Sequence, residues 1–189
     1  MNIYDFDDTI FLGDSSVRFI KYSLKKHPFL VLWCIVKGLK ECIKYLFKKS
    51  NFGFIKSELF SFVKHIDNLD EYMNEYVIKH QKYIKKFYLE QKKDDDVVIS
   101  ASFEFIVKPF CDKLGIKTVI ATKYDTKKGC IVGKNCKGKE KIVRFNEVFK
   151  KYHVNEAYSD SLSDIPMFEI ADAAFLVKGE ELIPYQIQK

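Results

Sequence analysis

The feature that most constrains this chain is a cluster of three carboxylates directly behind its N-terminal apolar stub: Asp5, Asp7 and Asp8 in the run DFDDT. Carboxylates at this spacing repel one another, so the cluster is costly unless a cation or an electrophile uses it. If residues 2–6 form a buried parallel strand, Asp5 and Asp7 leave its carboxyl end close together, where open α/β sheets place ligands. The alternative is a solvated turn, since aspartate favours turns.

A β-branched run at residues 97–100 predicts a second strand, which ends in Ser100. The residues that follow, 101–115, predict a helix closed by Gly115. A hydroxyl at this point suits a phosphoryl oxygen, because the free N–H groups and the dipole of a helix N-terminus favour anions. The alternative is that Ser100 or Ser102 only caps the helix.

Two later segments carry charged residues near predicted helix starts. Lys137, Lys139 and Lys141 begin an amphipathic helix, where cations oppose the helix dipole unless an anion is present. A solvated side chain is the alternative for each lysine. Asp160 follows a short apolar strand and Asp164 lies four residues further on, so both carboxylates can approach one cation. Helix capping explains Asp160 but not the repeat at Asp164.

The order of these segments resembles the haloacid dehalogenase superfamily of phosphohydrolases. DFDDT corresponds to the first motif of that superfamily, VISAS to the second, the lysine of KGKEK to the third and SDSLSD to the fourth. The motifs cover residues 1–13 and about 95–178. The segment between them is similar only as an inserted helical cap, which the phosphoserine-phosphatase-like branch also carries soon after its first motif.

The resemblance implies an α/β fold: a three-layer, Rossmann-like core with a mainly parallel sheet, plus an inserted all-helical cap. We expect the core to comprise residues 1–13 and 95–189, and the cap to comprise residues 14–94. Within the cap the sequence predicts helices throughout, with breaks at three places. These are His27–Pro28, Ser50–Gly53 and Asp67–Asn68.

The resemblance also implies an activity, the hydrolysis of phosphate monoesters through an aspartyl phosphate. Asp5 is expected to attack phosphorus, and Asp7 to protonate the leaving oxygen and later to deprotonate the attacking water. Ser100 is expected to hydrogen-bond a phosphoryl oxygen. Thr9 is expected to fix the loop that holds Asp5 and Asp7.

A lysine of the third motif is expected to neutralise the developing charge on the phosphoryl group. Aligning the helix body IVRFNEVFKKYH selects Lys141, and matching the K-G dipeptide selects Lys137 instead. We favour Lys141. Asp14, Ser15 and Ser16, at the start of the cap, are expected nearest the leaving group, and Ala101 is a further expected substrate contact.

Mg²⁺ is the implied cofactor. Magnesium prefers oxygen ligands, and the expected set is the carboxylate of Asp5, the backbone carbonyl of Asp7 and the carboxylate of Asp160. Asp164 is expected either as a further ligand or as a residue behind the ligands. The cation would lie between Asp5 and an anionic phosphate, which would otherwise repel each other.

The substrate follows less directly from the resemblance. Phosphoserine phosphatases usually carry glycine in the second and fourth motifs, whereas this chain has Ala101, Ser102, Ser159 and Ser161 there. The sequence therefore predicts a small soluble phosphate ester without selecting phosphoserine. The alternative is a phosphorylated lipid headgroup, as in bacterial phosphatidylglycerophosphate phosphatases of the same branch.

That alternative depends on the basic first part of the insert. From Val17 to Ser50 the chain has nine cations and one anion, a net charge of +8 against +6 for the whole chain. One helical face is apolar and the other is basic. The apolar face comprises Leu39, Cys42, Ile43, Leu46 and Phe47, and the basic face comprises Lys37, Lys40, Lys44 and Lys48. Such a helix can rest on an anionic membrane. We favour a different interpretation of this helix, in which the apolar face packs inside the cap and the lysines are solvated.

The composition excludes several classes of protein. Five cysteines without a C-x-x-C pair suggest neither a disulfide framework nor a structural zinc site. The N-terminus does not resemble a signal peptide, so we expect a cytoplasmic protein. A catalytically inactive module that binds membranes or nucleic acid is the alternative to an enzyme, and because all catalytic positions are filled we expect no nucleic acid as partner.

Overall fold

The computed structural model describes residues 1–49 and 52–187, with a six-stranded sheet at the centre. The strand order is β3-β2-β1-β6-β7-β8, and all neighbouring strands run parallel except β7 and β8. This confirms the predicted α/β fold with a mainly parallel sheet. The strands are β1 (Asn2–Tyr4), β2 (Val97–Phe103), β3 (Thr118–Thr122), β6 (Val154–Ser159), β7 (Ala171–Lys178) and β8 (Glu181–Tyr185), with a separate ribbon of β4 (Tyr124–Asp125) and β5 (Cys130–Ile131).

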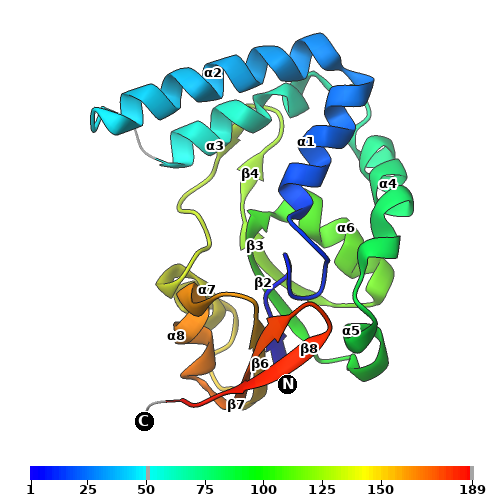
Figure 1. The fold of residues 1–189 in the computed structure, drawn as a ribbon, viewed down its shortest axis with the longest axis vertical. Helices are drawn as coiled ribbons and strands as arrows, with labels where there is room; N and C mark the ends of the chain where they lie inside the picture. Colours follow the sequence, from blue (N-terminus) through cyan, green and yellow to red (C-terminus); the bar gives the residue numbers. More distant parts are fainter. Residues whose placement is uncertain (50–51, 188–189) are drawn as a thin grey trace.

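Strand β1 lies in the middle of the sheet and is buried on both faces. Ile3 belongs to a hydrophobic cluster with residues of the helices α7 and α8, whereas Tyr4 belongs to a second cluster with residues of α5 and α6. Because successive side chains point to opposite faces, apolar strands of this kind need helices on both sides. Three layers result (Figure 1), with α7 (Lys139–Val148) and α8 (Ile165–Phe168) on one face and α5 (Lys86–Gln91) and α6 (Glu104–Leu114) on the other.

Strand β2 is longer than the sequence predicts. It continues through Phe103, and α6 begins at Glu104 rather than at residue 101. The pairing of β2 with β3 shifts register between Ser100 and Phe103. Irregular pairing of this kind redirects side chains at the end of a strand. Gly115 adopts a left-handed conformation with a φ of 77° and closes α6 as predicted.

The described residues between β1 and β2 form helices and add no strand to the sheet. Pro28 is the first residue of α2, where a backbone N–H would have no acceptor within the helix, so its absence costs nothing. Asn68 caps the N-terminus of α4. Of the predicted break at Ser50–Gly53, residues 50–51 lie outside the described residues. The elements are α1 (Ser15–Lys26), α2 (Pro28–Leu46), α3 (Phe52–Phe60), α4 (Leu69–His80) and α5, with single 3₁₀ turns at Ser61–His65 and Gln81–Tyr83.

An aromatic cluster joins these helices to the sheet. The ring of Phe19 in α1 lies 6.3 Å from Phe60, 5.2 Å from Tyr76 in α4 and 5.7 Å from Phe105 in α6, measured between ring centroids. Tyr4 of β1 is part of the same hydrophobic cluster. The insert and the sheet thus share one core, and the boundaries of a separate cap domain at residues 14 and 94 stay a prediction.

Helix α2 differs from the favoured prediction, in which the apolar face of residues 39–47 packs inside the insert. The buried residues of α2 are Val31, Cys34 and Gly38 instead; Gly38 lies against Leu59 of α3, and Cys34 Sγ lies 3.2 Å from the hydroxyl of Ser61 just after α3. A Cβ at Gly38 would lie 2.6 Å from Leu59 Cδ2, so the glycine lets the two helices approach closely. The predicted apolar face points away from α3, with exposed fractions of 57% for Leu39, 56% for Ile43, 78% for Leu46 and 71% for Phe47. No helix in residues 1–49 or 52–187 is long and apolar enough to cross a membrane.

Candidate active site

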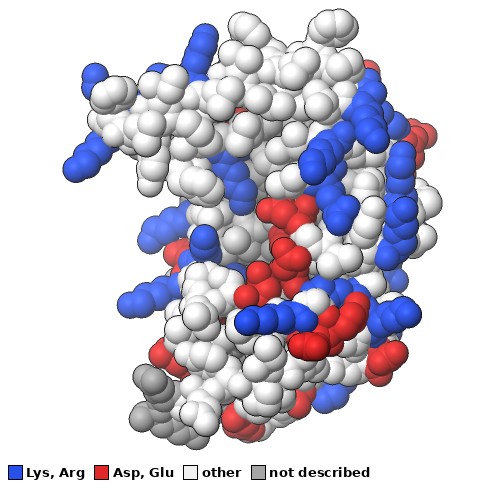
Figure 2. Space-filling model, viewed as in Figure 1, with Lys and Arg blue, Asp and Glu red and all other residues white. Residues whose placement is uncertain are grey.

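A cavity of about 330 Å³ lies at the carboxyl edge of the sheet, below α3. The carboxyl ends of β1, β2 and β6 meet there, and β1 separates the other two strands. Figure 2 shows acidic side chains gathered in the hollow of this face. Of the predicted site residues, Asp5, Asp7, Asp14, Ala101, Lys141, Asp160 and Asp164 line the cavity. Thr9 and Ser100 are fully buried behind its wall.

The loop after β1 is tightly folded around Asp8. This residue adopts a left-handed conformation with a φ of 51°, which aspartate tolerates better than most residues. Its carboxylate accepts a hydrogen bond from the N–H of Gly13 at 2.8 Å, and its carbonyl accepts one from the ammonium of Lys85. The hydroxyl of Thr9 accepts a hydrogen bond from the N–H of Asp160 at 2.9 Å. Thr9 therefore links the loop of the first motif to the fourth motif.

Asp7 is held by neutral donors. Its Oδ1 accepts a hydrogen bond from the N–H of Ser15 at 2.6 Å, and its Oδ2 accepts one from the hydroxyl of Ser102. The Ser102 hydroxyl also lies 2.9 Å from that of Ser16. Burial raises the pKa of Asp7 to about 7, and the hydrogen bonds oppose this rise only in part. A carboxyl group with such a pKa can hold or release a proton near neutral pH.

Lys141 bridges two carboxylates in the interior. Its ammonium donates hydrogen bonds to Asp5 Oδ1 and Asp164 Oδ2, both at 2.7 Å, and the side chain is 1% exposed. Burial alone lowers the pKa of Lys141, but the two carboxylates outweigh it and the pKa is raised. Burial raises the pKa of Asp5, and the nearby ammonium opposes that shift. Lys137, the other candidate from the sequence, lines the cavity but is exposed and makes no ion pair that the structure records.

The fourth motif supplies two carboxylates in different surroundings. Asp164 Oδ2 accepts a further hydrogen bond from the hydroxyl of Ser159 at 2.7 Å, while its Oδ1 is buried without a partner. Asp160 follows β6 and reaches the cavity from its rim. Partial burial, and after it the charges of Asp5 and Asp8, raises the pKa of Asp160 to about 6.

These donors fit a hard divalent cation. Asp5, Asp7 and Asp160 offer oxygen atoms as ligands, and a cation would relieve the repulsion by Asp5 and Asp8 that adds to the effect of burial on the pKa of Asp160. Among the described residues, no three acidic, histidine or cysteine side chains are arranged to hold a metal by themselves. The predicted set needs only two carboxylates, because the third ligand is the backbone carbonyl of Asp7.

The structure does not bring Ser100 to the cavity. Its hydroxyl accepts a hydrogen bond from the N–H of Ser102 at 3.0 Å, behind the wall that Ala101 and Ser102 form. The irregular end of β2 is the physical reason, since it turns residues 101 and 102 toward the cavity. The predicted contact between Ser100 and a phosphoryl oxygen stays a prediction.

Lys56 of α3 is a cavity residue that the sequence reasoning missed. Its ammonium donates hydrogen bonds to the carbonyl of Ala101 at 2.7 Å and to the side-chain oxygen of Asn135 at 3.2 Å. It lies 4.5 Å from the centre of the Phe103 ring. Burial lowers the pKa of Lys56 to about 8. The available signal was a single lysine in a helix whose other residues, apart from Ser57 and Glu58, are apolar or glycine.

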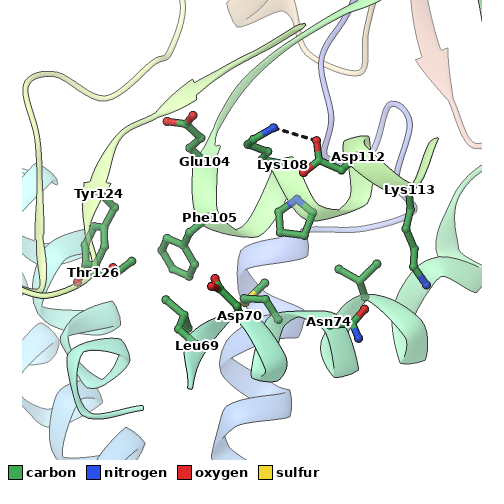
Figure 3. A pocket seen from close by; sticks show the side chains of 13 residues that line it. Leu69, Asp70, Asn74, Glu104, Phe105, Lys108, Asp112, Lys113, Tyr124 and Thr126 are labelled. Atoms are coloured by element: carbon green, nitrogen blue, oxygen red, sulfur yellow. Dashed lines mark hydrogen bonds and ion pairs between the residues drawn. The ribbon is translucent and has the colours of Figure 1, made fainter. Parts of the chain in front are cut away.

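A larger cavity of about 750 Å³ lies between α4, α6 and β4. Figure 3 shows Asp70 and Asn74 of α4 on one side, with Phe105, Lys108 and Asp112 of α6 on the other. None of the four sequence motifs lines this groove. Its one ion pair within the wall, Lys108 with Asp112 at 2.8 Å, joins neighbours on the same helix. The smaller cavity at the sheet edge is therefore the candidate active site.

Comparison with known proteins decides the family. Residues 3–169 match the model of the haloacid dehalogenase-like hydrolases. The chain belongs to this family. The match spans all four motifs and the helical segment between the first and the second.

Similar proteins of this family include phosphatases. A histidinol-phosphatase of Neisseria meningitidis is 28% identical over 58% of this chain and 56% of that protein, and the chain spans about half the length or less of the curated relatives it matches. A protein of unknown function from Bordetella pertussis has a similar structure, with a TM-score of 0.73, 16% identity and coverage of 93% of this chain and 88% of that one. A phosphoserine phosphatase, solved as a phospho-aspartyl intermediate analogue, has a TM-score of 0.52, 21% identity and coverage of 92% and 84%. These two structural similarities show that this chain shares the fold of both proteins.

The bridge made by Lys141 predicts an effect on stability. Lys141→Met leaves two buried carboxylates without their cation, so the free energy of unfolding should fall by about 3 kcal/mol. Urea unfolding in the presence of a chelator measures this loss, because no metal ion can then replace the ammonium. Adding Asp164→Asn to the variant should recover part of it.

The matched control is Lys137→Met, which removes an exposed lysine four residues away. Its unfolding free energy should stay within about 0.5 kcal/mol of the wild type. Equal losses in the two variants would contradict the assignment of the bridge to Lys141.

Proposed function

We propose that this protein is a Mg²⁺-dependent phosphomonoesterase that acts through an aspartyl phosphate on Asp5. The observation that carries the proposal is the contrast between two carboxylates of one loop. Asp5 is ion-paired with Lys141, while Asp7 is held by uncharged donors in the same cavity. Two such environments suit different tasks, one for a nucleophile and one for an acid or base.

Each step uses a group of this chain. A carboxylate oxygen of Asp5 attacks phosphorus, the bond from phosphorus to the ester oxygen breaks, and Asp7 gives its proton to the departing alkoxide. Asp7 then takes a proton from a water molecule, whose oxygen attacks the same phosphorus and releases Asp5 and inorganic phosphate. The ammonium of Lys141 lies 2.7 Å from Asp5 Oδ1 and offsets negative charge as it develops.

Mg²⁺ would be held by the carboxylates of Asp5 and Asp160 and by the carbonyl of Asp7. When bound, it polarises the phosphoryl group and screens it from the carboxylates. Asp164 is either a further ligand through Oδ1 or a residue behind the ligands, because its Oδ2 already accepts hydrogen bonds from Lys141 and Ser159 while its Oδ1 has no partner. Thr9 supports the arrangement by holding the backbone of Asp160.

A small phosphate ester is the proposed substrate. The volume of about 330 Å³ suits a phosphate group with a compact leaving group. Asp14 and Ser16 at the start of α1 and Lys56 of α3 line the side of the cavity that the insert forms, so we place the leaving group there. A phosphorylated lipid headgroup is the second candidate, because Phe52 of α3 lines the cavity and is 56% exposed, which joins the cavity to an apolar surface.

The proposed nucleophile and acid make separable predictions. Asp5→Asn should lower the turnover of an aryl phosphate by roughly a thousandfold or more with the fold intact, because an amide cannot attack phosphorus. Asp7→Asn should lower kcat/KM for alkyl phosphates by roughly 10²- to 10⁴-fold and for aryl phosphates much less, because kcat/KM reports the steps up to release of the leaving group and a phenolate leaves without a proton. Steady-state kinetics on both esters measures the difference.

Asp172→Asn is the control, since Asp172 is exposed on β7 and does not line the cavity. Its turnover should stay near that of the wild type. Equal losses for aryl and alkyl esters in Asp7→Asn would argue against Asp7 as the acid.

Metal dependence is a further prediction. Activity should disappear in excess chelator and return with Mg²⁺, and Asp160→Ala should raise the Mg²⁺ concentration for half-maximal activity at least tenfold. A titration of activity against free Mg²⁺ measures both effects. Asp172→Ala, an exposed aspartate on β7, is the control and should not shift the titration. Full activity in chelator would refute the proposed site.

Lys56 predicts a pH dependence of substrate affinity. Its pKa of about 8 means that the ammonium loses its proton as the pH rises through that value. The KM for an aryl phosphate dianion should therefore rise above about pH 8, because the cavity loses a cation. In Lys56→Arg the rise should be absent, since a guanidinium stays charged. Lys64→Arg is the control, because Lys64 is an exposed lysine after α3, and it should keep the wild-type rise in KM. An unchanged rise in KM in Lys56→Arg would contradict the role of Lys56.

A further inference from the structure

Helix α2 carries a long apolar stripe that nothing in residues 1–49 and 52–187 covers. Its apolar residues recur every three or four positions, so they lie on one side of the helix. This side is opposite to the one that packs on α3. Figure 2 shows the uncharged side chains along the top of the molecule, where Figure 1 places α2. The stripe comprises Phe29, Leu32, Trp33, Val36, Leu39, Ile43, Leu46 and Phe47, each at least 44% exposed.

A row of lysines follows one edge of this stripe. Lys37, Lys40, Lys44 and Lys48 are also spaced by three or four residues, and the last three are exposed. Glu41 is the one acidic residue between Pro28 and Lys49, against five lysines. It pairs with Lys44 at 2.5 Å. The surface of α2 is thus both apolar and strongly positive.

This combination selects among possible occupants. A second copy packed antiparallel on the stripe would bring the two lysine rows together, and like charges in contact oppose association. An anionic bilayer is complementary to both features, since apolar side chains enter the boundary between headgroups and acyl chains while lysines contact the headgroups. Trp33 is exposed on the same side of the helix, and tryptophan side chains favour this boundary.

We propose that α2 docks this protein on the surface of an anionic membrane, with the helix lying parallel to the bilayer. Phe52 and Phe54 at the start of α3 are also apolar and exposed, at 56% and 60%, and Phe52 lines the cavity. The docking itself does not require the proposed phosphatase activity; only the choice of a lipid phosphate as substrate rests on that function.

The single tryptophan of the chain, Trp33, reports directly on docking. On addition of vesicles made of equal parts phosphatidylcholine and phosphatidylglycerol, its emission should shift to the blue and the protein should sediment with the vesicles. Vesicles of phosphatidylcholine alone should bind much more weakly. High salt should weaken binding to the anionic vesicles, because it screens the lysines.

Two variants of the full chain test the two features of the surface separately. Each lysine near an anionic surface strengthens binding roughly fivefold, so changing the four lysines of the row to glutamine should weaken vesicle binding by up to several hundredfold. Leu39→Ser with Ile43→Ser and Leu46→Ser should abolish the blue shift. Neither variant changes a residue of the cavity, so both should keep the wild-type turnover of a soluble aryl phosphate.

The matched control replaces Lys21, Lys25, Lys79 and Lys82 by glutamine, which removes the same charge from exposed positions on other elements. It should bind vesicles nearly as well as the wild type. Equal weakening in this control, or no binding of the wild type to anionic vesicles at low salt, would overturn the proposal. A blue shift that grows with protein concentration in the absence of vesicles, together with dimers in sedimentation, would assign the stripe to a second copy instead.

The outcome is independent of the catalytic proposal. Asp5→Asn should bind anionic vesicles as the wild type does, even though its turnover is lost. If vesicles bind and no ester is hydrolysed, the proposed function fails and the docking surface stands. If an aryl phosphate is hydrolysed and no vesicle binds, docking fails and a soluble phosphate ester becomes the substrate class that the cavity supports.

Discussion

The ammonium of Lys141, buried between Asp5 and Asp164, is the interaction on which the rest of the site depends. It joins the first, third and fourth motifs at one point, although they lie far apart in the sequence. A buried ion pair adds little net stability, but removing one partner leaves an uncompensated charge. The bridge therefore acts less as a source of stability than as a constraint on the fold. The end of β1, the start of α7 and the turn after β6 must meet at this cavity, because otherwise the three buried charges would lack partners.

The insert completes the opposite wall of the same cavity. The N–H of Ser15 in α1 and the hydroxyl of Ser102 in β2 hold Asp7, and Lys56 of α3 reaches across to the carbonyl of Ala101. The aromatic core around Phe19 fixes these helices against α6. The proposed acid Asp7, the ammonium of Lys56 and the proposed place of the leaving group are thus brought together by packing that is remote from the cavity.

Part of this arrangement was predictable from the sequence. Asp5, Asp7, Asp160 and Asp164 follow strands of a parallel sheet, and such strands carry their ligands at one edge. The preference for Lys141 over Lys137 followed from the family resemblance, by alignment of the helix body IVRFNEVFKKYH, and the structure buries Lys141 on the same face as Phe145. These features depend on local order along the chain, and local order is what a sequence displays.

Other features depend on contacts between distant segments. Lys56 belongs to no motif, and only the folding of α3 over β2 brings it to Ala101. The irregular end of β2, which exchanges Ser100 for Ser102 at the cavity wall, arises from its register with β3. The apolar face of residues 39–47 was predicted to be buried, because most such faces are. Instead α3 packs on the side of α2 that contains Gly38. Periodicity shows that a helix has an apolar side, but not which element covers it.

The central claim is that Asp5 carries the phosphoryl group, and the most direct test is to trap the phosphorylated enzyme. The protein is mixed with an aryl phosphate and Mg²⁺, quenched in acid and reduced with borohydride, which converts an aspartyl phosphate to homoserine. Mass spectrometry then locates the converted residue. The account predicts homoserine at position 5, more of it in Asp7→Asn, where hydrolysis of the intermediate is slowed, and none in Asp5→Asn. Conversion of a different residue, or turnover with no converted residue even in Asp7→Asn, would contradict it.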